Sequence, residues 1–234
     1  MLEIFKDVPG VQVFMSEKKA GNLKLLAPNF EENRKKYFDK NNLNYEKLVS
    51  AKLEHGNNIQ IIIDNQKKFV DYTDGLLTNN FEIILSVTVA DCLPIFVFDP
   101  VQKVVGVLHC GWRGVAGGII EKASQKMEKN FGSDLKNVLV GIGPGIQSCH
   151  FEVENDLLEN FKGYEKFSRE KNNKKYLDLK GIVRAKLISN GIEIENIEID
   201  KRCTFCQSEL WSYRRDGEDS FGVQAMMAGI KLID

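Results

Sequence analysis

A series of short, strongly apolar segments rich in β-branched residues constrains the fold of this chain more than any other feature. Five of them are bounded by turn residues and have the length of single strands: Ile59–Asp64, Ile83–Ala90, Pro94–Phe98, Val104–Leu108 and Val138–Ile142. Further strands are expected around Ile197–Asp200 and Leu210–Tyr213. Because no segment approaches the ~18 apolar residues of a membrane span, the series predicts a sheet core and no membrane partner.

Helical spacing appears in two places. One helix is expected to begin at Ile119 and end at Gly132, and another fits Leu179–Ser189. Two polar segments, Glu31–Lys47 and Glu165–Tyr176, interrupt the apolar pattern. Their density of charge is typical of solvated helix faces or surface loops. Neither has the composition of a flexible linker.

The overall composition places the chain among ordinary folded proteins. Its 234 residues are 43% hydrophobic and carry 32 Lys and Arg against 33 Asp and Glu. With clustered strands, a few helices and no linker, we expect one α+β domain over residues 1–234, with a mixed β-sheet core flanked by helices. The balanced charge argues against a nucleic-acid partner.

The cysteine count and the first residues bear on the compartment. Five cysteines are an odd number and too few for a disulfide scaffold. The start, MLEIFKDVPGVQVF, lacks the basic and apolar regions of a signal peptide. We therefore expect a cytoplasmic protein, as a monomer or weak homodimer.

Three residues could together hold a metal ion. The chain has only three histidines. His55 precedes an expected strand, Cys92 follows SVTVAD, and His109 closes VVGVLH. Two imidazoles and a thiolate suit tetrahedral Zn²⁺ and leave a fourth position for water. The alternative is that Cys92 is a small buried hydrophobe and the histidines are ordinary core residues.

Two arginine-bearing segments could bind an anion. In HCGWRGVAGG, glycines permit close backbone approach, a helix is expected to follow, and Arg113 adds a fork of donors. Arg214 and Arg215 could complete an anion pocket. The glycines could instead serve only packing, and the paired arginines could bind the neighbouring acidic residues Asp216 and Glu218.

Two further motifs suggest less chemistry. Cys203-x-x-Cys206 lacks the second pair that a zinc ribbon needs, and the helix expected for a thioredoxin-like pair does not follow it. The glycines of GIGPG at 141–145 do not match a dinucleotide fingerprint, and a turn after a strand explains them better.

Several of these segments, taken in order, resemble one family. The YfiH-like family, whose members carry the label multicopper polyphenol oxidase or laccase-domain protein, has motifs similar to four parts of this chain. These are TVADCLPIFVFDP, VVGVLHCGWRGVAGG, GIGPGIQSCHFEV and RCTFC with SYRRDG. The similarity runs from DGLLT near Asp74 to the end of the chain and includes the His55 segment.

The resemblance implies a single α+β domain with Zn²⁺ held by His55, Cys92 and His109, which would also be the catalytic residues. It implies phosphorolysis of adenosine, inosine, guanosine or methylthioadenosine, with adenosine deaminase activity. Purine nucleoside and phosphate would be the partners, and Arg113, Arg214 and Arg215 are the candidate phosphate ligands. A bacterial branch is linked to peptidoglycan precursor editing.

The sequence departs from the family pattern near these residues. The family's Q-V-H-G reads Glu54-His55-Gly56 after Leu53, so a carboxylate replaces the expected neighbour of the first histidine. Cys110 replaces an alanine, and His150 stands in the segment GPGIQSCHFEV. Asp91 and Glu54 are candidates for orienting a ligand imidazole.

Two other functions remain to be weighed. A Cys–His hydrolase acting on peptidoglycan precursors would use Cys92 as nucleophile and His109 as base. A copper polyphenol oxidase would need many more imidazoles than three, although the two histidines and the cysteine could bind copper adventitiously.

Overall fold

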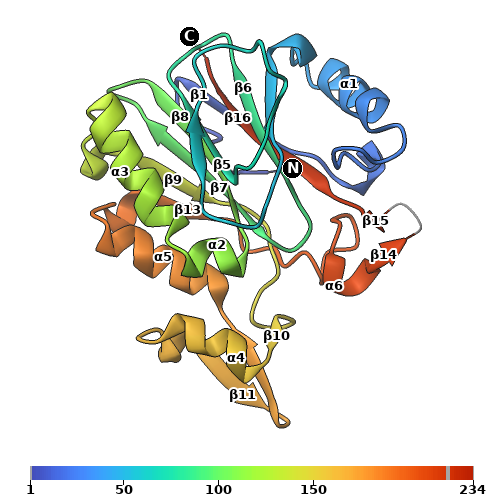
Figure 1. Cartoon of the computed structure of the whole chain (residues 1–234), viewed down its shortest axis with the longest axis vertical. Helices are drawn as coiled ribbons and strands as arrows, with labels where there is room; N and C mark the ends of the chain where they lie inside the picture. The colour runs from blue at the N-terminus through green and yellow to red at the C-terminus, as the bar shows by residue number, and fades with distance from the viewer. Residues whose placement is uncertain (1, 220–221, 234) are drawn as a thin grey trace.

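The computed structural model describes residues 2–219 and 222–233 and forms four layers. Two mixed β-sheets pack face to face, and helices cover their outer faces (Figure 1). The predicted α+β fold with a mixed sheet core flanked by helices is therefore confirmed.

The first large sheet carries most of the predicted strands. Its central strands are antiparallel, and each edge strand runs parallel to its neighbour. In spatial order the strands are β13 (Ile197–Ile199), β9 (Leu139–Ile142), β7 (Leu93–Asp99), β8 (Val104–Cys110), β5 (Gly75–Thr78) and β3 (Ile59–Ile61).

The second large sheet joins segments from both halves of the chain. Its order is β1 (Val11–Met15), β16 (Met226–Leu232), β6 (Ile84–Val89), β2 (Leu48–Ala51) and β4 (Phe69–Val70). Smaller sheets contain β10 (Glu152–Val153), β12 (Lys174–Leu177) and β11 (Ser168–Lys171), and β14 (Glu218–Asp219) with β15 (Gly222–Val223).

The helices of the described residues lie mainly outside the sheets (Figure 1). The α-helices are α1 (Phe30–Lys40), α2 (Trp112–Ala116), α3 (Ile119–Phe131), α4 (Asn155–Leu158), α5 (Leu179–Ser189) and α6 (Tyr213–Asp216). Single 3₁₀ turns are η1 (Lys18–Ala20), η2 (Tyr45–Lys47), η3 (Leu135–Asn137), η4 (Glu159–Phe161), η5 (Glu165–Phe167) and η6 (Ile194–Asn196).

Strand β7 explains why the central strands are continuous apolar runs. Ile95 and Val97 belong to the core that includes α3 and α5. Phe96 and Phe98 belong to the core between the two sheets. Because successive side chains of a strand point to opposite faces, a strand covered on both faces must be apolar throughout.

The predicted helices and most predicted strands are confirmed with small changes at their ends. Helix α3 ends before Gly132, whose φ of 70° is the left-handed conformation that glycine adopts readily. Helix α5 has the predicted bounds. Strand β7 begins one residue earlier than predicted, at Leu93, so that Pro94 lies inside it. Because pairing with β9 begins only at Ile95, the amide hydrogen that Pro94 lacks is not needed there.

Two expectations about secondary structure are wrong. Residues 210–213 form no strand: Leu210 is buried in an irregular segment, and Ser212 caps α6 by accepting a hydrogen bond from the Arg215 amide. Most of the polar segment 165–176 is the β11–β12 hairpin rather than a helix face or loop. Its turn residues Asn172 and Asn173 both have positive φ, as a tight hairpin turn requires.

The polar segment 31–47 fits its prediction only in part. It forms most of α1 and ends in η2, but Arg34 and Phe38 are buried beneath the helix. The guanidinium of Arg34 donates to the Leu23 carbonyl and to Ser50 Oγ. In the part of the chain that the structure describes, no helix is long and apolar enough to cross a membrane.

We predict that the Gly106→Ala substitution destabilises the fold. A Cβ atom at Gly106 in β8 would meet the side chains of Leu77 and Val97 and approach the Leu76 carbonyl oxygen. Overpacking of this kind costs about 1–3 kcal/mol in the free energy of unfolding, which urea denaturation would measure. The exposed Gln125→Ala control should stay within about 0.5 kcal/mol of the wild type. Equal stability of both variants would contradict the packing argument.

Candidate active site

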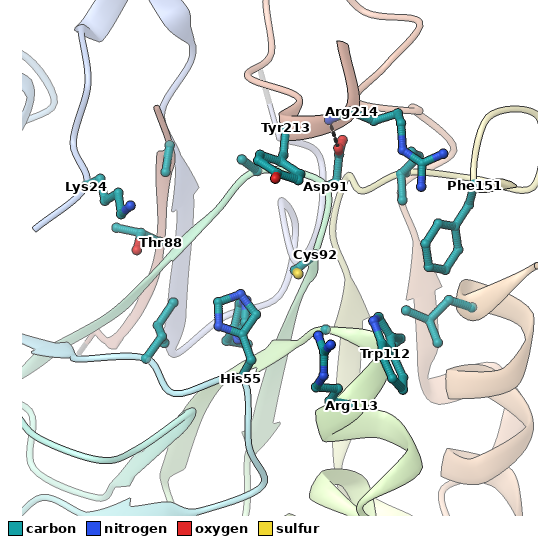
Figure 2. Close-up of a pocket in the computed structure, with 17 residues that line it drawn as sticks. Lys24, His55, Thr88, Asp91, Cys92, Trp112, Arg113, Phe151, Tyr213 and Arg214 are labelled. Atoms are coloured by element: carbon teal, nitrogen blue, oxygen red, sulfur yellow. Dashed lines mark hydrogen bonds between the residues drawn. The ribbon is translucent and has the colours of Figure 1, made fainter. Parts of the chain in front are cut away.

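One cavity of about 460 Å³ is lined by most of the site residues predicted from the sequence: His55, Cys92, His109, Arg113 and Arg214. Its wall is contributed by the ends of β6 and β8, by α2, by the segment between β9 and β10 and by α6 (Figure 2). Cavities of this size commonly bind small molecules. Lys24 adds a cationic side chain to the wall, and several lining residues are apolar or aromatic: Leu53, Trp112, Ile146, Phe151 and Tyr213.

The structure brings together the three predicted metal ligands at this cavity. His55 lies in the turn between β2 and β3, Cys92 in the turn between β6 and β7, and His109 near the end of β8. Their potential ligand atoms all lie within 4.8 Å of one another. The two imidazole rings meet edge to face, with centroids 4.8 Å apart.

A buried carboxylate, Asp74, positions both histidines. Its Oδ1 lies 2.9 Å from His109 Nδ1 and accepts a hydrogen bond from the His55 amide. Its Oδ2 accepts from the Gly56 amide at 2.8 Å. Because Nδ1 of His109 is engaged in this way, the other ring nitrogen is left for Cys92 or a metal ion.

The sequence interpretation missed this carboxylate and named two others. Asp91 does not contact a ligand imidazole: its carboxylate accepts from Thr204 Oγ1 and from the Arg214 amide. Glu54 contributes its backbone amide to Asp74 Oδ2. The available signal was Asp74 itself, an acidic residue directly before the buried strand β5.

The Cys92–His109 pair has strongly perturbed titration. Burial raises the pKa of the Cys92 thiol, but the charge and hydrogen bond of His109, aided by His55, outweigh burial and lower this pKa to about 6. Burial lowers the pKa of His109, but the charge of Cys92 and the hydrogen bond to Asp74 outweigh it and raise this pKa to about 9. A thiolate at neutral pH is the form that binds metals.

Gly111 provides the space that the cluster needs. A Cβ atom there would lie 3.1 Å from Cys92 Sγ, 3.6 Å from a His109 ring carbon and 3.7 Å from a His55 ring carbon. A Cβ atom at this position would therefore crowd the Cys92 sulfur and would touch both imidazole rings at ordinary contact distance. The nitrogen and sulfur donors also match the preference of Zn²⁺, so these residues fit a zinc ion.

Two of the three predicted anion-binding arginines line the cavity. Arg113 projects from α2 with its guanidinium carbon 4.3 Å from the Trp112 ring centroid (Figure 2). Arg214 lies on α6, and its backbone amide donates a hydrogen bond to Asp91 Oδ2 at 2.7 Å. Its guanidinium donates to the Glu152 carbonyl at 3.0 Å. Both carry positive charge to the cavity wall.

Arg215 is not among the residues that line the cavity. Its guanidinium donates to the backbone carbonyls of Thr204, Phe205 and Gln207 and pairs with Asp216. Arg215 therefore holds the 203–210 segment in place. Lys24, which was not predicted from the sequence, adds a cationic side chain to the cavity wall (Figure 2).

Comparison with known proteins places this architecture in a family. A family model described as multi-copper polyphenol oxidoreductase laccase matches residues 27–231. The crystal structure of the Bacillus licheniformis hypothetical protein YfiH superimposes with a TM-score of 0.90 at 27% identity, covering 99% of this chain and 95% of that one.

Curated relatives carry a consistent name. The purine nucleoside phosphorylase LACC1 of Mus musculus is 29% identical over 201 residues, which cover 83% of this chain and 46% of the relative. The purine nucleoside phosphorylase YlmD of Bacillus subtilis (strain 168) is 29% identical over 198 residues, covering 79% of this chain and 71% of the relative. The chain spans about half the length of the mouse and human relatives. It belongs to the family described as multi-copper polyphenol oxidoreductase laccase.

Proposed function

We propose that this chain is a zinc-dependent purine nucleoside phosphorylase that also deaminates adenosine. It would split adenosine, inosine, guanosine or methylthioadenosine with phosphate into free base and pentose 1-phosphate. The observation that carries this proposal is the cluster of His55, Cys92 and His109 inside a cavity that arginines also line. The names of the relatives support the substrate class.

The donor set assigns a role to each residue of the cluster. His55, Cys92 and His109 would hold the zinc ion, and Asp74 would orient His109 through its Nδ1 hydrogen bond. Three protein ligands leave one position for water or a substrate oxygen. When bound, Zn²⁺ would supply a Lewis acid that lowers the pKa of a coordinated water toward ~7.

The cationic side chains suit the phosphate of a phosphorolysis. In that reaction a phosphate oxygen bonds to the anomeric carbon, while the glycosidic bond breaks and leaves its electron pair on the purine nitrogen, which then takes a proton. Arg113 and Arg214 would hold the phosphate beside the anomeric carbon. Trp112, Phe151 and Tyr213 offer ring faces for the purine.

We expect the protein to occur in a reducing cytoplasm, where its cysteines stay as thiols, and to be a monomer or weak homodimer. The five cysteines are all free. Thiols in such a compartment remain available as metal ligands.

Product analysis tests the activity directly. With adenosine, inosine or methylthioadenosine, purified protein should release free base only when phosphate is present, together with an equal amount of pentose 1-phosphate. Inosine formed from adenosine would report deamination. The His109→Ala variant should lose about 100-fold or more of either activity, because it removes a ligand and the partner of Asp74. Identical product traces from wild type and His109→Ala would sink the proposal.

The Asp74→Asn substitution should weaken zinc binding while keeping the shape of the side chain. Loss of the carboxylate that orients a ligand histidine typically costs about 10–100-fold in metal affinity. Competition with a chromophoric chelator would measure the change. The matched control is Asp71→Asn, an exposed carboxylate paired with Lys52, which should leave zinc affinity unchanged. Equal affinities of the two variants would contradict the role of Asp74.

Arginine variants test phosphate binding. Arg113→Met and Arg214→Met should each raise KM for phosphate by about 10-fold or more, since each removes a charge-assisted hydrogen bond of about 1.5–3 kcal/mol. KM for the nucleoside should change less. Arg184→Met on α5, which does not line the cavity, is the control. Unchanged phosphate KM in both variants would show that the anion binds elsewhere.

One observation favours a second function, a Cys–His hydrolase, whose peptidoglycan-precursor substrate comes only from the family resemblance. The pKa of Cys92, lowered to about 6 against the opposing effect of burial by the charge and hydrogen bond of His109, is also what a nucleophilic thiol requires. A metal chelator distinguishes the two functions, because a zinc-dependent enzyme would lose its activity in the chelator, whereas alkylation of Cys92 would inactivate both. A hydrolase would keep its activity in a metal chelator and lose it on alkylation of Cys92.

The family description names a copper oxidase, but the sequence does not support that chemistry for this chain. A multicopper centre draws its ligands from many imidazoles, and the whole chain has three histidines. Two histidines and one cysteine do resemble a mononuclear copper ligand set. Copper binding at His55, Cys92 and His109 would therefore be adventitious.

A further inference from the structure

A second group of metal-binding side chains lies outside the cavity wall. Cys149, His150, Cys203 and Cys206 place one potential ligand atom each within 4.8 Å of all the others. None of the four lines the cavity that holds His55, Cys92 and His109. The Cys203-x-x-Cys206 pair therefore does have two partners, which come from a segment more than fifty positions earlier in the chain.

The parallel pairing of β9 and β13 brings the two segments together. Because these neighbouring strands run in the same direction, the segments that follow them begin at the same edge of the sheet. Gly145 forms an isolated bridge with Cys203 and accepts a hydrogen bond from the Thr204 amide. The Gln147 amide donates to Cys203 Sγ at 3.4 Å. The backbone thus fixes both segments before any ion is considered.

Three distances among Cys149, His150 and Cys206 are close to those of a tetrahedral zinc site, and Cys203 Sγ lies within 4.8 Å of all three ligand atoms. Cys149 Sγ and Cys206 Sγ are 3.8 Å apart. His150 Nδ1 lies 3.2 Å from Cys149 Sγ and 3.3 Å from Cys206 Sγ. With Zn–S of about 2.3 Å and Zn–N of about 2.0 Å, a regular tetrahedron has edges of about 3.8 Å between sulfurs and about 3.5 Å between nitrogen and sulfur.

The imidazole of His150 is held in the orientation that ligation needs. Its ring stacks on Phe205, with centroids 4.1 Å apart and an angle of 17° between the planes. Phe205 lies between the two cysteines of the Cys-x-x-Cys turn, whose Cys206 amide donates to the Cys203 carbonyl. Stacking therefore joins the histidine of one segment to the turn of the other and directs Nδ1 toward the sulfurs.

A disulfide explains fewer of these contacts. Bonded sulfurs are about 2.05 Å apart, and a bond between Cys149 and Cys206 would leave Cys203 and the aimed His150 without a role. Three sulfurs and one nitrogen around one point are a common structural zinc set. We propose that Cys149, His150, Cys203 and Cys206 form a second, structural metal site that binds Zn²⁺ through three thiolates and one imidazole.

The site would stabilise one wall of the cavity. Ile146 and Phe151, which line the cavity, flank the Cys149–His150 pair in the chain. On the other segment, Thr204 donates to Asp91, whose carboxylate also accepts the amide of Arg214. A zinc ion at the second site would thus link the two chain segments that place Phe151 and Arg214.

Metal analysis tests this site without any assay of turnover. Protein stripped of metal, reloaded with Zn²⁺ and passed through a desalting column should retain one equivalent fewer in Cys206→Ser than in wild type. Because Cys206 is exposed, the variant should keep the wild-type fold, which circular dichroism would check. Ser148→Ala, in the same loop but without a ligand atom, is the matched control and should retain the wild-type amount. In Cys92→Ser, which removes a ligand of the first cluster, Co²⁺ should still give the intense absorption of a tetrahedral thiolate site.

Three outcomes would overturn the second site. The first is a Cys92→Ser variant that binds neither Zn²⁺ nor Co²⁺. The second is equal zinc content in folded Cys206→Ser and wild type, with His150→Ala checked as an independent ligand variant. The third is mass spectrometry that finds Cys149 joined to Cys206 as a disulfide in protein kept under reducing conditions. Each result is independent of whether the first cluster catalyses phosphorolysis.

Discussion

The arrangement of the cavity depends on one buried carboxylate. Asp74 is fully enclosed, and its two oxygens accept hydrogen bonds from the amides of His55 and Gly56 while Oδ1 also meets the His109 ring. Burial alone would raise the pKa of Asp74, but the hydrogen bonds of His109 and the Gly56 amide outweigh burial and hold this pKa below its usual value. The charge of Asp74 thus links the turn that contains His55 and Gly56 to the His109 imidazole of strand β8.

The same interaction explains an unusual backbone conformation. His55 has a positive φ of 57°, which a residue with a side chain adopts only at some cost. The two amide hydrogen bonds to Asp74 offset that cost and turn the imidazole toward Cys92. Helix α2 packs closely on the same turn, which the absence of a side chain at Gly114 permits. A Cβ atom there would collide with the Gly56 carbonyl oxygen.

Sequence reasoning named the three residues that the structure brings together at the cavity, but not the carboxylate that contacts both histidines. His55, Cys92 and His109 stand at expected strand ends in recognisable motifs, so their residue types were informative. Asp74 was missed because its role comes from contacts with residues 19 and 35 positions away. The proximity of Cys149 and His150 to Cys203 could not be predicted from the sequence for the same reason, since only the pairing of β9 with β13 brings these residues together.

The fold shows the same division between local and distant information. Strands β7 and β8 were evident because burial on both faces requires continuous apolar sequence. The β11–β12 hairpin was missed because its exposed residues have no apolar alternation, although two consecutive asparagines marked its turn. The strand expected around Leu210 does not form, although Leu210 is buried. An apolar residue in the sequence indicates that its side chain is buried, but it does not show that its backbone pairs with another strand.

The position of β16 sets the order in which the protein can be completed during synthesis. This strand, Met226–Leu232, lies between β1 and β6 and pairs antiparallel with both. Strand β1 leaves the ribosome some two hundred residues before its partner exists. Until Leu232 has emerged, the second sheet lacks an inner strand and β6 presents an open edge. Closure of the two-sheet core is therefore a late, long-range event, which favours slow folding and a need for protection of the nascent chain.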